Sequence, residues 1–279
     1  MGQGDDLSPA APHPAGQPRR WRPGIALWVS AVIHVLAVLG LMVQPQWWAP
    51  IVIALIANHV ALVLMGLWPR SQGLGSNMLR LPAAAAQRHE IALTFDDGPD
   101  PDVTPKVLDI LDAHRAKASF FVIADKAAAH PDLIREIVRR GHSIENHSRR
   151  HSSFFGFFGW SALRQDIGVS QQIIAGITGQ APAFFRAPMG IRNPLLDPAI
   201  ARFGLRYVSW TRRGFDTVAR DPTVVLERLT RNLAAGDILL LHDRLTRKYG
   251  AIALAVLPGL LNRIDAAGLR PVSLPLAMR

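Results

Sequence analysis

Two adjacent carboxylates and three imidazoles in this chain have the types and spacing to do chemistry. The carboxylates are Asp96 and Asp97 in the stretch TFDDGP, and the imidazoles are His147 and His151 in HSRRH and His242 in LLH. One carboxylate and two imidazoles make a three-ligand set for a divalent metal and leave positions for water and substrate. Hydrolysis also needs a base that takes a proton from the metal-bound water and an acid that protonates the leaving group. The second aspartate could act as the base and His242 as the acid.

Each of these residues also has an ordinary structural explanation. Asp, Gly and Pro favour turns, so Asp-Asp-Gly-Pro could be only a turn. The two histidines of HSRRH could lie on a solvated basic face, since two arginines stand between them. Arg186 could be a surface ion-pair partner, and His242, next to apolar residues, could be a core histidine. What favours chemistry is that all of them follow apolar runs in one alternating segment.

The segment that carries these residues alternates apolar runs with helical patterns from Glu90 onward. The predicted strands are Ile91–Phe95, Ser119–Ile123, His142–Asn146, Phe184–Arg186, Leu205–Trp210, Asp237–His242 and Pro271–Leu274. The predicted helices are Thr104–Arg115, Pro131–Arg140, Trp160–Ala175, Pro198–Phe203, Pro222–Ala234 and Ile252–Ala267. This alternation predicts a mainly parallel sheet or barrel wrapped by helices, with the active site at the carboxyl ends of the strands. The polar residues stand at those ends.

An uncharged stretch precedes this segment, because no Asp, Glu, Lys or Arg occurs between Arg22 and Arg70. It contains two apolar segments, Gly24–Val43 and Ala49–Trp68, each near the roughly 20 residues that cross a bilayer. Gln44-Pro45-Gln46 separates them, and tryptophans stand at their ends. We predict a hairpin of two transmembrane helices, whose polar residues His34, Asn58 and His59 hydrogen-bond between the helices. Buried core helices and a cleaved signal peptide are the alternatives, and the second apolar segment argues against the peptide.

The predicted organisation has four parts: a disordered tail (1–22), the hairpin (23–69), a linker (70–89) and a catalytic domain (90–279). Arginines flank the hairpin on both tails and its loop carries no charge, which places the catalytic domain on the cytoplasmic side of a bacterial inner membrane. These arginines explain the net charge of +10 better than nucleic-acid binding does, since no basic stripe is present. The chain has no cysteine, so His, Asp or Glu must hold any metal.

Five motifs occur together and in order. They are TFDDG at Thr94–Gly98, HSxxH at His147–His151, RxPxG at Arg186–Gly190, a tryptophan and later aspartate at Trp210 and Asp216, and LLH at Leu240–His242. With these motifs the segment from about Glu90 to Leu274 resembles the polysaccharide deacetylase family, also called the NodB-homology or carbohydrate esterase family 4 domain. The resemblance implies an α/β fold, a distorted (β/α) barrel of about seven strands, here preceded by the two transmembrane helices.

The resemblance also implies a role for each motif residue. Asp96 is the base, while Asp97, His147 and His151 bind one divalent transition metal, most commonly Zn²⁺, with Co²⁺ or Ni²⁺ as alternatives. Arg186 pairs with Asp96, and Asp216 orients His242, the general acid. The metal and the backbone N–H of Met189 stabilise the oxyanion, and Pro188, Met189 and Trp210 contribute to substrate binding. Two residues depart from the family pattern: Met189 stands where Tyr or Phe is usual, and Thr217 where Trp often follows the aspartate.

The resemblance implies removal of N-acetyl, sometimes O-acetyl, groups from sugars such as chitin oligomers, peptidoglycan and surface polysaccharides. The loop SSFFGFFGW at Ser152–Trp160 is either a buried core loop or a membrane-dipping loop beside the site. Our hypothesis is a deacylase of an N-acylated amino-sugar glycan or a polyprenyl-phosphate-linked sugar, with membrane lipid as a partner and no nucleic acid. The alternatives are an outward-facing cell-surface polysaccharide or peptidoglycan deacetylase and a catalytically idle sugar-binding membrane module.

Overall fold

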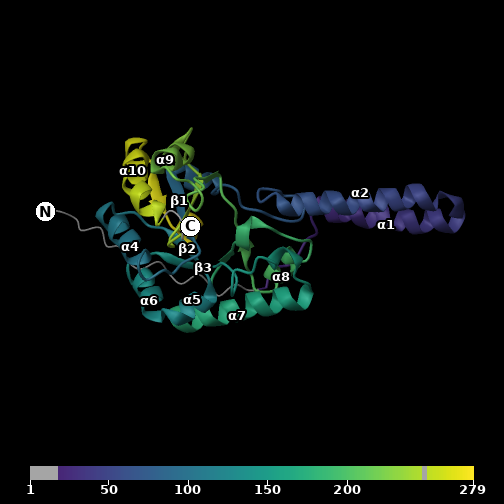
Figure 1. Ribbon diagram of the computed structural model, residues 1–279, viewed down its shortest axis with the longest axis horizontal. Helices are drawn as coiled ribbons and strands as arrows, with labels where there is room; N and C mark the ends of the chain where they lie inside the picture. The colour runs from purple at the N-terminus through teal and green to yellow at the C-terminus, as the bar shows by residue number, and fades with distance from the viewer. Residues whose placement is uncertain (1–17, 247–249) are drawn as a thin grey trace.

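The computed structural model describes residues 18–246 and 250–279, so most of the predicted disordered tail lies outside the described residues. Helices α1 (Ile25–Val43) and α2 (Trp48–Leu67) lie side by side and project from the body that holds the sheet, as Figure 1 shows. The short 3₁₀ turn η1 (Pro45–Trp47) joins them at the break that the sequence predicts. Both helices are long and apolar enough to cross a membrane. Only 11% of the most apolar stretch of the first helix and 6% of that of the second are buried against the rest of the protein.

The two helices of this hairpin exchange a polar contact in their apolar interior. Asn58 Nδ2 donates to Ser30 Oγ across the hairpin at 2.9 Å. The rings of His34 and His59 meet edge to face, with centroids 5.2 Å apart. The prediction that polar residues in the spans hydrogen-bond between the helices is confirmed for Asn58. It is not met by His34 and His59, whose Nδ1 atoms each lie 2.7 Å from a carbonyl four residues earlier in their own helix.

The body is built on an eight-stranded sheet in which every strand pair is parallel. Seven strands follow the order β5-β4-β3-β2-β1-β7-β6, and β8 pairs with the first half of β1. The strands are β1 (Glu90–Asp96), β2 (Ser119–Val122), β3 (Ser143–Asn146), β4 (Phe184–Phe185), β5 (Arg206–Tyr207), β6 (Arg212–Arg213), β7 (Ile238–His242) and β8 (Arg270–Val272). The sheet is parallel and covered by helices, which confirms the predicted α/β class.

Helices cover this sheet and enclose a main core. They are α3 (Ala83–Gln87), α4 (Thr104–Ala113), α5 (Ala124–Ala129), α6 (Pro131–Arg139), α7 (Trp160–Thr178), α8 (Leu196–Ala201), α9 (Pro222–Thr230), α10 (Ile252–Ala266) and α11 (Leu274–Ala277). The largest buried cluster joins β1, β2 and β7 to α4, α6, α9 and α10. A second cluster joins α7 and α8 to the loop around Phe155. A further cluster holds the other face of β1, β2 and β7 through Ala92, Phe121 and Ile238, so these strands have apolar packing on both sides.

Four elements were not predicted, and one strand is shorter than predicted. Strand β6 and helices α3, α5 and α11 were not predicted, because they are short and three of them consist mainly of alanine or arginine. Strand β5 spans two residues instead of Leu205–Trp210, and Val208, just beyond its end, forms an isolated parallel bridge with Met78. Short polar or alanine-rich pieces carry no hydrophobic period, and pairing with a residue far away in sequence decides their state.

Residues 70–89 connect the hairpin to the sheet, as expected of a linker, but they pack on the body. Leu74, Leu81 and Ala85 are buried, and Met78 N–H donates to the Tyr207 carbonyl at 3.0 Å. Arg19, from the predicted tail, forms an ion pair of 2.7 Å with Asp197. These contacts join residues more than 100 positions apart, so no local pattern in the sequence indicates them.

The end of α2 is attached beside the RxPxG loop. Arg192 N–H donates to the Gly66 carbonyl at 3.0 Å, and the Ser209 hydroxyl donates to the Pro69 carbonyl at 2.6 Å. Gly190 has φ +74, and a Cβ there would lie 2.7 Å from Pro69 and 2.8 Å from the Trp210 ring. Only glycine permits this approach of the post-hairpin segment to the RxPxG loop.

Candidate active site

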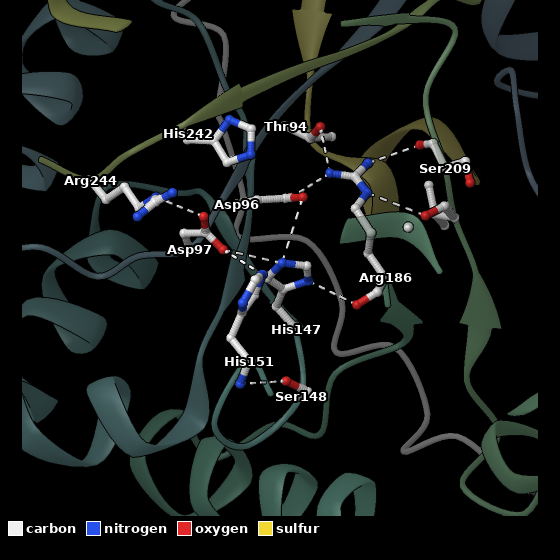
Figure 2. A network of polar contacts seen from close by, with 12 residues as sticks. Thr94, Asp96, Asp97, His147, Ser148, His151, Arg186, Ser209, His242 and Arg244 are labelled. Atoms are coloured by element: carbon white, nitrogen blue, oxygen red, sulfur yellow. Dashed lines mark hydrogen bonds and ion pairs between the residues drawn. The ribbon is translucent and has the colours of Figure 1, made fainter. Parts of the chain in front are cut away.

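The carboxyl ends of four strands meet at one edge of the sheet and carry the polar residues singled out in the sequence. Asp96 ends β1, His147 follows β3, Arg186 follows β4 and His242 ends β7. Figure 2 shows these side chains converging, with Asp97 between the histidines. They line or adjoin a pocket of about 150 Å³. The structure therefore brings together the residues that the five motifs predicted.

Asp97, His147 and His151 form a cluster in which one ligand atom from each lies within 4.8 Å of the others. Asp97 Oδ1 is 3.4 Å from His147 Nε2 and 3.2 Å from His151 Nε2. This oxygen is buried and has no hydrogen-bond partner of good geometry. His147 Nδ1 lies 2.8 Å from the Arg186 carbonyl, so a neutral ring donates there and leaves the Nε2 lone pair toward Asp97. A buried carboxylate oxygen without a partner, facing two imidazole nitrogens, fits a divalent metal ion.

The charge state of Asp97 also suits a ligand. Burial by itself would raise the pKa of this carboxyl. Interaction with the His147 imidazole, together with the charges of His242 and His151 when these rings are protonated, outweighs burial and holds the pKa of Asp97 well below its usual range. Asp97 is therefore a carboxylate at neutral pH.

Left-handed backbone conformations gather at this cluster. Asp97, Ser148, His151 and Met189 have φ between +52 and +73, a region that residues other than glycine rarely adopt. Each costs on the order of 1 kcal/mol and persists only where the surroundings hold it. Lys126 Nζ donates to the Asp97 carbonyl at 2.7 Å, and His151 N–H donates to Ser148 Oγ at 3.0 Å. These contacts fix the ligand side chains in place.

Asp96 is held by a buried arginine. Arg186 is fully buried and donates from Nη1 to Asp96 Oδ1 at 2.5 Å and to Thr94 Oγ1 at 3.0 Å. Its other donors reach the backbone carbonyls of Val208 and Ser209, and its guanidinium lies 4.1 Å from the centre of the Phe121 ring. Together these contacts compensate the positive charge of the Arg186 guanidinium, whose burial without partners would be unfavourable. The second oxygen, Asp96 Oδ2, is left facing His147 Nε2 at 3.8 Å.

His242 forms a pair with Asp216 and lies next to Asp96, its register partner on the neighbouring strand β1. Asp216 Oδ1 lies 2.9 Å from His242 Nδ1, and Asp216 Oδ2 accepts the His242 backbone N–H at 2.8 Å. Burial lowers the pKa of His242, but the hydrogen bond and charge of Asp216, with the charges of Asp97 and Asp96, outweigh it. The net result is a raised pKa. Nε2 of this ring is the nitrogen that remains for a substrate.

The RxPxG loop and Trp210 form one wall of the pocket. Met189 and Trp210 line it, and Met189 is 41% exposed, so its side chain is available at the mouth. Pro188 is buried and is not among the lining residues. Thr217, where the family often has Trp, also lines the pocket.

Two arginines and a lysine at the site were missed from the sequence. Arg244 Nε lies 2.8 Å from Asp97 Oδ2, and Arg213 lines the pocket from β6. Lys126 holds the Asp97 carbonyl from α5. The position of Arg244 two residues after the LLH motif was an available signal. No pattern marked the other two, because each reaches the site from an element that was not predicted.

The phenylalanine-rich loop is partly core and partly surface. Phe155 is 1% exposed and packs in the second apolar cluster. Phe154 and Phe157 are 71% and 85% exposed. Asn193, next to the residue that bonds the end of α2, donates to the Gly156 and Phe158 carbonyls at 3.1 and 2.8 Å. The core interpretation therefore holds for Phe155, while the membrane-dipping interpretation stays a prediction for the exposed Phe154 and Phe157.

Comparison with known proteins gives concordant matches. A family model described as polysaccharide deacetylase matches residues 83–208. The chain is 32% identical to a chitooligosaccharide deacetylase of Sinorhizobium fredii over 163 residues, which cover 58% of this chain and 76% of the relative. It is 32% identical to a peptidoglycan-N-acetylglucosamine deacetylase of Bacillus cereus over 160 residues, covering 55% and 72%. The crystal structure of the Bc1960 peptidoglycan N-acetylglucosamine deacetylase matches with a TM-score of 0.67 and 27% identity, covering 72% of this chain and 92% of that one.

Proposed function

This chain belongs to the polysaccharide deacetylase family, and from that membership we propose that it is a metal-dependent hydrolase that removes N-acetyl groups from amino sugars. The observation that carries the proposal is the pocket itself. It combines the Asp97–His147–His151 cluster with a carboxylate held by Arg186 and an imidazole held by Asp216. The names of the relatives, a chitooligosaccharide deacetylase and a peptidoglycan-N-acetylglucosamine deacetylase, support an amino-sugar substrate.

Asp97, His147 and His151 would hold one divalent ion, zinc or alternatively cobalt or nickel. Such an ion, when bound, activates water and polarises the amide carbonyl as a Lewis acid. Its ligands leave coordination positions open, since only three side chains contribute.

The chain's own residues then divide the proton transfers. Asp96 takes a proton from the attacking water on Oδ2, because Arg186 already holds Oδ1. The backbone N–H of Met189 donates to the developing oxyanion. His242 gives its Nε2 proton to the departing nitrogen while Asp216 holds Nδ1. The amide C–N bond breaks, and acetate and a free amine are released.

The test is acetate release from N-acetylated chito-oligosaccharides and from peptidoglycan fragments by the purified full chain in detergent. We expect acetate in amounts that match the new free amines. An idle sugar-binding module, the alternative from another class, would bind the same oligosaccharides and release none. Such a result would reject the hydrolase.

Replacing Asp216 by Asn tests the role of His242 through pH. His242 must be protonated to act as an acid, and Asp216 raises its pKa, so the active form persists above the ordinary pKa of about 6.5. Without the carboxylate the pKa falls, and the alkaline limb of kcat/KM moves to lower pH. We expect Asp216→Asn to lose about tenfold more activity at pH 8 than at pH 6. A loss of equal size at every pH would contradict this role.

We further propose that α1 and α2 anchor the protein as a two-pass hairpin with the catalytic domain on the cytoplasmic side. The exposed apolar helices, their terminal tryptophans and the arginines on both tails support this. The exposed Phe154 and Phe157 lie on the loop tied beside the end of α2, which suits contact with the bilayer surface and a lipid-linked sugar as substrate.

A compartment-sensitive reporter fused after Arg279 tests this topology. We expect a cytoplasmic signal and an uncleaved chain that stays in the membrane fraction. A signal from the far side would reject the orientation and favour a finished glycan at the cell surface. A shortened chain released from the membrane would instead identify α1 as a signal sequence.

A further inference from the structure

We propose that the mouth of this pocket binds an anionic oxygen group, a phosphate or carboxylate, that the substrate carries beside its N-acetyl sugar. Arg213 and Arg244 are the residues that bind it. The inference rests on the proposed function, since it narrows the substrate class of the same site from any N-acetylated sugar to an anionic one.

Arg244 stands at the mouth with most of its donors uncommitted. It lies in the loop after β7, its side chain is 39% exposed, and Figure 2 shows it reaching toward Asp97. Among the described residues its ion-pair partner is Asp97 Oδ2, 2.8 Å from Nε, and that nitrogen lacks a hydrogen bond of good geometry. A guanidinium has five N–H donors, so one loose contact leaves capacity for another anion.

The carboxylate that Arg244 contacts is also the one that faces both cluster histidines. A cation held by Asp97, His147 and His151 would draw on the same negative charge. It would weaken the hold of Asp97 on Arg244. The guanidinium would then be available at the mouth of a site that has become more positive.

Arg213 lines the same pocket and, unlike Arg244, has no acidic ion-pair partner among residues 18–246 and 250–279. Its guanidinium lies 5.3 Å from the centre of the Trp210 ring and 4.9 Å from that of Phe215. Stacking of this kind fixes the plane of a guanidinium and leaves its in-plane N–H groups free. Its Nε is buried without a hydrogen-bond partner.

Arg212, the residue before Arg213, has an acidic partner, in contrast to Arg213. Arg212 pairs with buried Asp237 at 2.6 Å and also donates to the Arg231 and Asn232 carbonyls. It is a structural residue that ties β6 to the start of β7. Of the two adjacent arginines, the one that faces the pocket is therefore the one left unneutralised.

The charges around the pocket do not balance. The Asp96 carboxylate is matched by buried Arg186, which leaves Asp97 against Arg213 and Arg244. A divalent ion would add further positive charge. A neutral N-acetylglucosamine chain offers these guanidinium groups nothing to pair with, and covering an unpaired charge opposes binding. The planar fork of arginine matches the two oxygens of a phosphate or carboxylate.

The experiment compares three substrates that share one N-acetyl sugar. They are N-acetylglucosamine 1-phosphate, N-acetylmuramic acid with its lactyl carboxylate, and the neutral methyl glycoside of N-acetylglucosamine. The wild-type chain and the variants Arg213→Gln and Arg244→Gln are assayed for acetate release. Arg263→Gln is the matched control, since Arg263 lies exposed on α10 and its hydrogen bond is to Thr230.

We expect the wild type to have a KM at least about tenfold lower for an anionic substrate than for the neutral glycoside. Each pocket variant should raise that KM about tenfold more than it raises the KM for the neutral glycoside. The control should match the wild type. Comparison of the phosphate substrate with the carboxylate substrate identifies which anion the site prefers. A further assay with the same sugar phosphate carried on a polyprenyl chain distinguishes a lipid-linked substrate from a soluble one.

Binding provides a readout that does not need turnover. Calorimetry of N-acetylglucosamine 1-phosphate with Asp96→Asn should show an affinity that either arginine variant lowers about tenfold. Equal KM values for anionic and neutral substrates in the wild type, or equal losses on both in the variants, would overturn the anion site. Arginine-dependent binding without any acetate release would instead reject the proposed hydrolase while leaving the anion site standing.

Discussion

We expect Asp96→Asn to abolish acetate release, with kcat falling about 10³-fold or more, while the protein keeps its metal. The amide has the shape of the carboxylate and its oxygen can still accept from Arg186, but it cannot take a proton from water. Metal content by mass spectrometry and acetate release by a coupled assay measure the two effects separately.

The control for this variant is Asp102→Asn, an exposed aspartate outside the pocket whose change alters the net charge equally. It should behave as the wild type. Breaking the Arg186 pair also removes a buried charge partner, which costs about 3–5 kcal/mol of stability when a partner is lost altogether. A thermal melt therefore accompanies the assay. Unchanged turnover in Asp96→Asn, or loss of its metal, would contradict the assignment of Asp96 as the base.

The neighbouring carboxylate should give the opposite result for metal. We expect Asp97→Ala to lose the ion and to lower acetate release about 10³-fold, because the cluster keeps only two imidazole ligands. Chelation of the wild type should cause the same loss, and added Zn²⁺, Co²⁺ or Ni²⁺ should restore the wild type but not Asp97→Ala at equal concentration.

The two variants together separate the roles of adjacent aspartates. We expect Asp96→Asn to be inactive but to retain the metal ion, whereas Asp97→Ala should be inactive and should lack the ion. If Asp97→Ala bound one ion per chain with wild-type affinity, the cluster would not be the metal site. If both variants lost the metal, the division of labour between the two carboxylates would be wrong.

The sequence was sufficient for the part of the fold that is built on apolar periodicity. β1, β2 and β7 are buried and mainly apolar, β3 is mostly buried, and each appears within one or two residues of its predicted bounds. Their carboxyl ends carry the motif residues, so the parallel arrangement alone predicted which side chains would meet.

The remaining features depend on contacts that a local pattern does not contain. β6 consists of two arginines and exists because it pairs with β7 and because Arg212 binds Asp237. Helix α5 is short and rich in alanine, and it supplies Lys126 to the site. Arg213 was missed for the same reason. Its position follows from the pairing of β6 with β7 and from stacking on Trp210 and Phe215, and neither leaves a period in the sequence. Arg244 differs, because it stands two residues after the LLH motif.

The attachment of α2 to the RxPxG loop limits the distance from the membrane at which the pocket can meet a substrate. Its last turn accepts a hydrogen bond from Arg192, and Pro69 packs against Gly190 in the wall of the pocket. Because these contacts join the pocket wall directly to the end of α2, no flexible linker separates them. The pocket therefore stays at a fixed distance from the end of the hairpin. In a bilayer the proposed enzyme would act within one thin layer of solvent, and it would meet a lipid-linked sugar by lateral diffusion in two dimensions. A polymer strand lying farther out would have to bend down to that layer.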